Sequence, residues 1–187
     1  MLIRSICPGD APAVAAIYAP YVLDSTASFE YDAPTAEEIA RRMELLTPQY
    51  PWIAAEEDGR LLGYAYASPH SERRAYSWDV HLSVYVAREE RGHGVGHRLY
   101  EALEEILRRQ GYQVLYGVVT GENHRSKGFH ESMGFILRAE FPDAGFKHGR
   151  WISTCWYEKR LGKEIPQHLP VSWRSLDLGD ILKGENK

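Results

Sequence analysis

The sequence has few cysteines, no long apolar run and no excess of basic residues. Its two cysteines, Cys7 and Cys155, are far apart and form no known motif, so we expect two reduced, buried thiols rather than a disulfide or a nucleophile. No apolar stretch approaches the roughly 18 residues that span a bilayer. Residues 1–10 lack the basic and apolar segments of a signal peptide. The formal net charge of −4 does not favour nucleic acid as a partner. These absences predict a cytoplasmic protein that binds neither membrane nor nucleic acid.

The bulk composition is that of one globular domain. The chain has 187 residues, of which 44% are hydrophobic and 26% charged, which is enough for a full apolar core. We expect the domain to span residues 1–161. The remaining segment, 162–187, mixes proline, charge and leucine, and the sequence assigns it no role.

Apolar periodicity and turn signals predict the order β-α-α-β-β-β-α-β-α-β-β. The expected strands cover residues 2–6, 52–56, 61–67, 76–86, 114–119, 135–141 and 151–159. The expected helices follow Asp10 through residue 22 and Thr35 through residue 46, and then cover residues 94–110 and about 123–133. A hairpin meander before the long helix and a strand–helix unit after it indicate an α/β (α+β mixed) fold, with one mixed sheet and helices on both faces.

A glycine-rich segment stands between the fourth strand and the long helix. It reads Arg91-Gly92-His93-Gly94-Val95-Gly96. Glycines let the backbone approach a ligand closely, and the free N–H groups of a helix N-terminus favour phosphate, so we expect this loop to hold a pyrophosphate. A purely structural turn is the alternative. A dinucleotide fold would need a βαβ unit with an acidic residue about 20 positions on, and a phosphate-binding Walker loop would end in Gly-Lys-Ser/Thr, so both fit poorly.

Longer motifs around this loop make the pattern more specific. The loop resembles the Gln/Arg-x-x-Gly-x-Gly/Ala segment of the GNAT superfamily, and the element order matches that fold up to about Leu161. Further matches resemble its phosphinothricin acetyltransferase branch. They are Tyr50-Pro51-Trp52, Ser83-Val84-Tyr85-Val86, Asn123-x-x-Ser126-x-x-x-His130-x-x-x-Gly134-Phe135 and Gly145-Phe146-Lys147-His148-Gly149-x-Trp151.

The resemblance implies a binding site for acetyl-CoA as co-substrate. In the family, the pantetheine arm pairs with a strand whose counterpart is Val84, Tyr85 and Val86, and a backbone N–H there polarises the thioester carbonyl. The pyrophosphate would lie on Arg91, Gly92, His93, Gly94, Val95 and Gly96, and Asn123 and Ser126 match the second coenzyme-contacting motif. Asn123 reads equally well as a plain helix N-cap.

The resemblance also implies the acid and base of the reaction. His130 occupies the position of the group that protonates the departing thiolate, although a structural histidine is an equal alternative. The branch usually carries a glutamate base where this sequence has His81. A neutral imidazole is chemically suited to that task, and Asp79, two residues earlier on the same strand face, could orient it and raise its basicity.

The acceptor side is expected to use Phe29, Arg73, Arg74 and His148. Phe29 matches an aromatic residue beside the family's substrate, and the arginines match basic residues that hold an acid group. His148 lies in the segment that borders the substrate pocket. Of the 12 tyrosines, only Tyr85 is expected near the cleft. His93 and His97 have metal-like spacing but no intervening glutamate, so no metal is expected.

The resemblance therefore predicts N-acetylation of a small amino acid such as phosphinothricin, methionine sulfoximine or methionine sulfone, by a homodimer. Two alternatives stay open. One is a protein that binds acetyl-CoA with weak turnover, which the His81 departure from the branch keeps possible. The other is an enzyme acting on a different amine, such as a peptide N-terminus, an arylamine or a polyamine.

Overall fold

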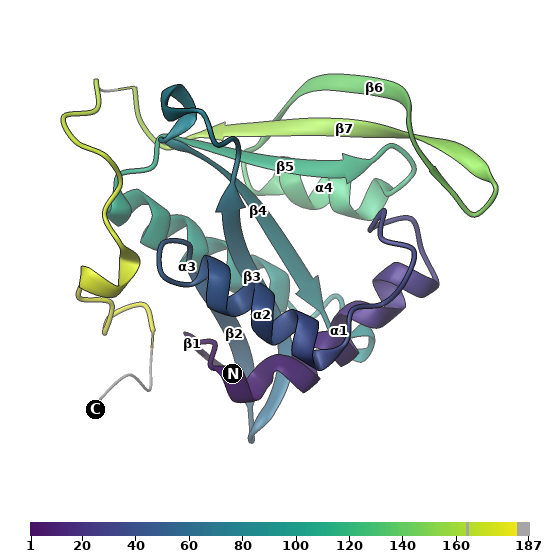
Figure 1. Cartoon of the computed structure of the whole chain (residues 1–187), viewed down its shortest axis with the longest axis horizontal. Coiled ribbons are helices and arrows are strands. Elements are labelled where there is room, and N and C mark those ends of the chain that lie inside the picture. Colours follow the sequence, from purple (N-terminus) through teal and green to yellow (C-terminus); the bar gives the residue numbers. More distant parts are fainter. Residues whose placement is uncertain (164, 183–187) are drawn as a thin grey trace.

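The computed structural model describes residues 1–163 and 165–182 and has the expected element order (Figure 1). Its strands are β1 (Leu2–Ser5), β2 (Trp52–Glu57), β3 (Arg60–Pro69), β4 (Asp79–Val86), β5 (Val114–Thr120), β6 (Ile136–Lys147) and β7 (Arg150–Arg160). Its α-helices are α1 (Ala11–Leu23), α2 (Ala36–Leu46), α3 (Val95–Gln110) and α4 (His124–Ser132).

The strands form one sheet in the order β1-β2-β3-β4-β5-β7-β6. Only β4 and β5 pair in parallel, and every other neighbouring pair is antiparallel. The two strands that run parallel are those that flank α3 in sequence, because a parallel neighbour requires a crossover connection. The predicted mixed sheet is confirmed.

Helices cover both faces of the sheet, as predicted, and two separate apolar clusters result (Figure 1). On one face, the stripe of α3 packs against the central strands with Leu99, Leu103, Ile106 and Leu107 fully buried. On the other face, α1 and α2 pack through Val14, Tyr18, Val22, Ile39 and Met43. Thr35 caps α2 as expected, accepting a hydrogen bond from the Glu38 N–H.

Three details differ from the sequence prediction. The fourth strand starts at Asp79 and not near residue 76, because Arg74–Tyr76 forms a 3-10 turn. The sixth strand extends to Lys147, and a turn with positive φ at His148 and Gly149 joins it to β7. Cys7 is exposed and not buried, because it lies in the connection after β1; Cys155 is buried, and both are free.

The described part of the C-terminal segment lies along α3 and the end of α2 (Figure 1). Trp173 is buried there, and its indole N–H donates to the carbonyl of Thr47 at 2.7 Å. The Gln110 amide donates to the carbonyl of Val171 at 2.7 Å, and Arg109 pairs with Asp180. This segment therefore adds buried area to the α3 side of the core. Across residues 1–163 and 165–182, no helix is both long and apolar enough to cross a membrane.

Candidate active site

A gap opens in the sheet where β4 and β5 separate. The two strands pair over three positions, from Asp79 opposite Val114 to His81 opposite Tyr116. Beyond His81, β4 continues to Val86 without a β5 partner, and a cavity of about 900 Å³ adjoins this stretch. The cavity is lined by both strands, the glycine loop, the start of α3 and α4. A strand-sized opening with unpaired backbone can receive an extended ligand as an additional strand.

The glycine loop closes one end of the cavity. Gly92 and Gly94 have φ of 91° and 80°, a left-handed conformation that other residues adopt at a cost. Gly94 is the N-cap of α3 and offers no side-chain cap, so the first N–H groups of the helix can bind an anion. The Arg91 guanidinium lies 4.6 Å from the ring centroid of Tyr21. The loop thus has the geometry and charge expected of a phosphate site.

Tyr21 from α1 fixes the end of β4. Its hydroxyl donates to the carbonyl of Val86 at 2.7 Å and accepts from the Val86 N–H at 3.0 Å. Backbone groups alternate between the two sides of a strand, so the N–H and C=O of Val84 point in the same direction as those of Val86, into the gap. Val84 is therefore the position on β4 best placed to pair with an extended ligand.

The cavity is richer in tyrosine than the sequence predicted. Tyr85 adjoins it, but its ring packs against Tyr18 and Tyr21 on the α1 face. Tyr21 and Tyr100 also line the cavity, so the expectation that only Tyr85 lies near the cleft is wrong. The sequence pattern hid these two residues because each has the spacing of an ordinary core-facing helix residue; Tyr21 is half-buried and Tyr100 is buried.

His130 is buried on the α4 side of the cavity and uses both ring nitrogens. Its Nδ1 lies 2.8 Å from the carbonyl of Ser126, so Nδ1 carries the proton. Its Nε2 then accepts from the Tyr100 hydroxyl at 3.1 Å. Burial lowers the pKa of His130, and the bond to Ser126 opposes this only in part. A Cβ on Gly117 would come within 2.4 Å of Nε2, so the ring fits only against a bare backbone.

The capping and coenzyme readings of Asn123 are compatible. Its side chain caps α4 by accepting from the Ser126 N–H at 3.1 Å, and both residues line the cavity. The geometry around His130 presents a neutral imidazole at this wall. The hydroxyl with a transferable proton here belongs to Tyr100, and burial raises the pKa of Tyr100.

His81 has a different partner from the one expected. Its Nε2 lies 3.0 Å from Nδ1 of His70, a residue that sequence reasoning did not single out. Pro69 is opposite Val80 in the β3–β4 ladder, so the next residue, His70, comes beside the start of β4. Asp79 lies on the same strand face as His81 but two residues away, which separates their Cα atoms by about 7 Å.

The charges around His81 also differ from the prediction. Burial, aided by the nearby charge of His70, lowers the pKa of His81 to about 4, so its basicity falls where a rise was expected. Burial raises the pKa of the Asp79 carboxyl, and the charge of His70 opposes that rise. The charge of His70 therefore bears on the pKa of both Asp79 and His81.

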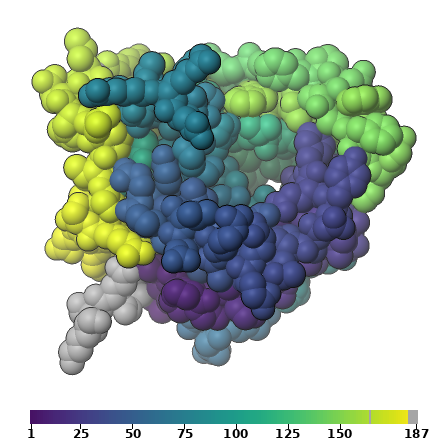
Figure 2. All heavy atoms as spheres, in the orientation of Figure 1, coloured from purple at the N-terminus to yellow at the C-terminus, as the bar shows by residue number. Residues whose placement is uncertain are grey.

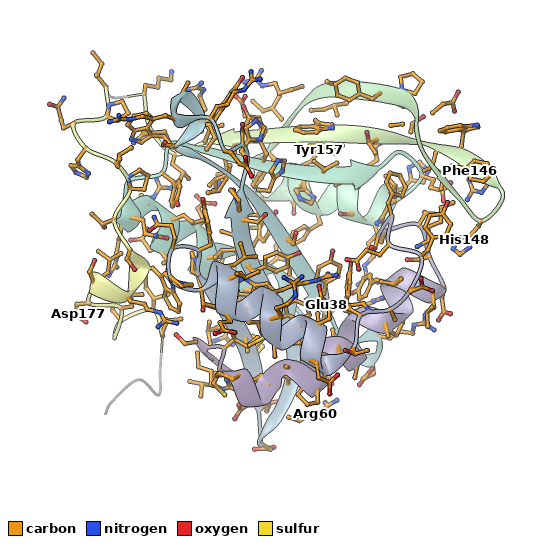
Figure 3. The ribbon with its side chains drawn as sticks, in the orientation of Figure 1. Glu38, Arg60, Phe146, His148, Tyr157 and Asp177 are labelled. Atoms are coloured by element: carbon orange, nitrogen blue, oxygen red, sulfur yellow. The ribbon has the colours of Figure 1, made fainter. Side chains whose placement is uncertain are left out.

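The four predicted acceptor residues fall into two separate groups. Phe29 packs on Gly145, where a Cβ would approach its ring to 2.4 Å, and His148 lies at the tip of the β6–β7 hairpin (Figure 3). Arg73 and Arg74 are exposed in the loop between β3 and β4. The arginine loop begins at His70, which stacks on Tyr116, and Tyr116 is opposite Glu158 on β7. Gly145, under Phe29, is opposite Ile152, six residues or about 20 Å away along β7, so the two groups are far apart in one chain.

The loop after α1 is fastened to the β6–β7 hairpin. The Lys147 ammonium is buried and donates to the carbonyls of Val22 and Ser28, both at 2.6 Å. Burial lowers the pKa of Lys147. Glu122 joins the same region by accepting from Thr26 and Arg150. Figure 2 shows the surface hollowed between residues 25–35 and this hairpin.

Comparison with known proteins identifies the family and the fold. The model of the acetyltransferase (GNAT) domain family matches residues 3–156. The chain is 39% identical over 163 residues to phosphinothricin N-acetyltransferase of Alcaligenes faecalis, covering 85% of this chain and 82% of that one. It is 31% identical over 164 residues to the L-methionine sulfoximine/L-methionine sulfone acetyltransferase of Pseudomonas paraeruginosa, covering 85% and 94%.

A solved structure gives the same result. The phosphinothricin acetyltransferase of Sinorhizobium meliloti, in complex with AcCoA, superposes with a TM-score of 0.85 at 31% identity, over 91% of this chain and 95% of that one. The family match spans the glycine loop, the separated strands and α4, which are the parts that build the cavity. The chain belongs to the GNAT acetyltransferase family.

Proposed function

We propose that this chain transfers the acetyl group of acetyl-CoA to the amino group of a small amino acid such as phosphinothricin, methionine sulfoximine or methionine sulfone. The observation that carries the proposal is the separation of β4 from β5 in front of the glycine loop. The loop fits a pyrophosphate, and the gap fits an extended pantetheine arm. The names of the relatives support the class of acceptor.

The reaction is a direct attack. The neutral amine nitrogen forms a C–N bond to the thioester carbon, the C–S bond breaks, and the thiolate leaves. The N–H of Val84 would stabilise the oxyanion that develops on the carbonyl oxygen. The Tyr100 hydroxyl, bonded to His130, lies on the cavity wall and would supply the proton that the thiolate takes up. The excess proton that the nitrogen loses on becoming an amide would restore this hydroxyl through solvent.

The amine must first lose a proton, and His81 is the base that we assign. It precedes Ser83 by two residues on the same face of β4, about 7 Å along the strand, and Ser83 lines the cavity. In this proposal, a water relay carries the proton from the amine in the cavity to His81. Burial lowers the pKa of His81 to about 4, so the imidazole is neutral at pH 7, the form in which a ring nitrogen can accept a proton.

Two other functions remain in competition: acetyl-CoA binding with weak turnover, and transfer to a different amine such as a peptide N-terminus, an arylamine or a polyamine. An assay of acetyl-CoA-dependent thiol release separates them. We expect turnover with the three amino-acid analogues and little with spermidine or an alanyl peptide. Tight acetyl-CoA binding without thiol release for any amine would favour the binding protein, and turnover only with the peptide or polyamine would replace the acceptor class.

We further propose a homodimer and a cytoplasmic location. The strand β6 is at the edge of the sheet. Large apolar side chains are exposed on β6 and β7, namely those of Ile136, Leu137, Phe141, Phe146 and Trp151. Large exposed apolar side chains along an edge strand are typical of a protein interface. Sedimentation should give twice the chain mass of 21.4 kDa, and a monomer at micromolar concentration would contradict the dimer. Two free cysteines suit a reducing compartment.

A further inference from the structure

The histidine pair of the acceptor side consists of His70 and His81 in direct contact. Their facing nitrogens are 3.0 Å apart, and their ring centroids are 4.9 Å apart. A contact of this length holds one N–H, which one imidazole donates and the other accepts. The assignment of that single proton decides which nitrogen of His81 has a free lone pair.

Only one arrangement leaves His81 able to act as a base. If His70 Nδ1 donates to His81 Nε2, the proton of neutral His81 lies on Nδ1 and its only lone pair is already used. If His81 Nε2 donates to His70 Nδ1, then His81 Nδ1 has a free lone pair and His70 carries its own proton on Nε2. Base catalysis by His81 therefore requires His70 as the hydrogen-bond acceptor.

Aromatic rings hold His70 in place. Its ring stacks on Tyr116 of β5 with centroids 4.6 Å apart, and it meets Tyr76 and Trp156 edge-on. Trp156 also lies edge-on to His81 at 5.4 Å. Imidazole orientation is thus fixed by packing on three sides, which is what a precise proton path requires.

Burial, and then the neighbouring His70, lower the pKa of His81. The pKa of the Asp79 carboxyl is raised by burial, and the charge of His70 opposes that rise. Glu158 and Arg160 of β7 place charges of opposite sign near Asp79. The same three charged groups act on the titratable hydroxyl of Tyr116 on β5. Two protonated imidazoles at this distance would repel each other strongly, so the pair takes up one excess proton and not two.

We propose that His70 is a positioning residue that acts through His81: it accepts the Nε2 proton of His81 and thereby directs the lone pair of Nδ1 to the acceptor amine. This inference rests on the proposed function. When the ammonium, directly or through a water, transfers a proton to His81 Nδ1, the resulting imidazolium keeps its Nε2–H bond to His70 Nδ1. Release of the Nδ1 proton to water then restores the starting tautomer, so the amine loses one proton and solvent gains one.

Two substitutions separate this role from packing. His70→Phe keeps an aromatic ring for stacking but removes the acceptor, and His70→Asn places an amide oxygen close to the position of Nδ1 without offering a titratable group. We expect His70→Phe to lower kcat on the order of 10-fold to 100-fold, within the range of base catalysis, with the KM for acetyl-CoA unchanged. His70→Asn should recover most of kcat at high pH but alter the acid limb of the profile.

A double substitution provides the internal control. In a His81→Ala background, His70→Phe should cause no further loss of kcat, because a positioning residue has nothing left to position. Ser71→Ala, a neighbouring change in the same loop, should leave kcat and its pH profile as in the wild type. Equal losses from His70→Phe in both backgrounds would overturn the proposal, as would a His70→Phe enzyme with the wild-type pH profile.

A measurement without turnover distinguishes failure of this inference from failure of the proposed function. Nitrogen-15 NMR of labelled protein reports the tautomer of each imidazole. We expect His81 protonated on Nε2 in the wild type, and a shift toward the Nδ1 tautomer in His70→Phe. Wild-type His81 protonated on Nδ1 would overturn the positioning role whatever the substrate. Absence of thiol release with every amine, alongside the expected tautomer, would count against the proposed function alone.

Discussion

Two regions of this molecule present different chemical groups, one mainly backbone groups and the other ionisable side chains. The glycine-loop region consists of Tyr21, Val84–Val86 and Arg91–Gly96, and it offers mainly backbone N–H and C=O groups. The histidine region consists of His70, Asp79 and His81, and it offers side chains that ionise. The first region needs a defined backbone path, while the second needs defined distances between ring atoms.

The difference explains how each region tolerates change. A backbone site survives many side-chain replacements but fails when a residue cannot adopt the required φ, as at Gly94. A side-chain site can be rebuilt with different groups as long as charge and hydrogen bonding still balance. In the proposed mechanism, His81 at the position where the resemblance implies a glutamate is such a rebuilding, and His70, 3.0 Å from its Nε2, is its partner.

The largest effect is expected in the histidine region. His81→Ala should lower kcat by about 10²-fold to 10⁴-fold, the usual contribution of a general base, and leave acetyl-CoA affinity unchanged. His81→Glu should retain activity, because a carboxylate can take the same proton. Steady-state kinetics with methionine sulfone and calorimetry with acetyl-CoA give both quantities. A His81→Ala enzyme with unchanged kcat/KM from pH 6 to 9 would remove His81 from the mechanism.

The next effect belongs to the glycine-loop region. Gly94→Asp should weaken acetyl-CoA binding on the order of 100-fold, because it adds a strained conformation and a negative charge at the phosphate site. Gly94→Asn is the matched control, since asparagine tolerates positive φ and has nearly the same volume without the charge. Calorimetry should rank wild type, Gly94→Asn and Gly94→Asp in that order. Equal affinity for all three proteins would place the phosphates elsewhere.

Sequence reasoning reached the fold and the glycine loop because their signals are local. The buried stripe of α3, the Asp58-Gly59 hairpin and the spacing from Arg91 to Gly96 all lie within short segments. Gly92 and Gly94 have the positive φ that glycine permits at such a turn. A local pattern of this kind can be recognised in the sequence without knowledge of tertiary contacts.

Sequence reasoning failed where a role depends on contacts between distant segments. His70 is 11 residues from His81, and only the β3–β4 register brings the two rings together. Tyr21 is 65 residues from Val86 and had the spacing of an ordinary buried helix residue. Asp79 matched the expected strand face, but the group within hydrogen-bond distance of His81 is His70, which only the β3–β4 register brings beside it.

A moderate effect would show which group of residues recognises the acceptor. Arg73→Ala or Arg74→Ala should raise the KM for the amino acid by about tenfold, as for an exposed charge-assisted hydrogen bond, with kcat nearly unchanged. These arginines lie in the His70 loop, whereas Phe29 is beside the β6–β7 hairpin. Arg174→Ala, which removes an exposed arginine from the C-terminal segment, is the control. If neither variant changes the KM while Phe29→Ala does, the hairpin recognises the acceptor.

The smallest effect concerns His130, on the α4 side of the cavity that the glycine loop closes. It tests whether the folded protein keeps this imidazole in its neutral form. Burial lowers its folded-state pKa below the unfolded value of about 6.5. At a pH between the folded and unfolded pKa values, His130 is protonated in the unfolded chain and neutral in the folded chain. The free energy of unfolding therefore decreases as the pH falls below about 6.5. Each unit of difference is about 1.4 kcal/mol. Urea unfolding from pH 7 to 4.5 should therefore show a shallower decline for His130→Gln than for the wild type. The exposed His124→Gln on the same helix should retain the wild-type decline. A His130→Gln protein with the same decline would mean that His130 takes up its proton as readily in the folded state as in the unfolded state.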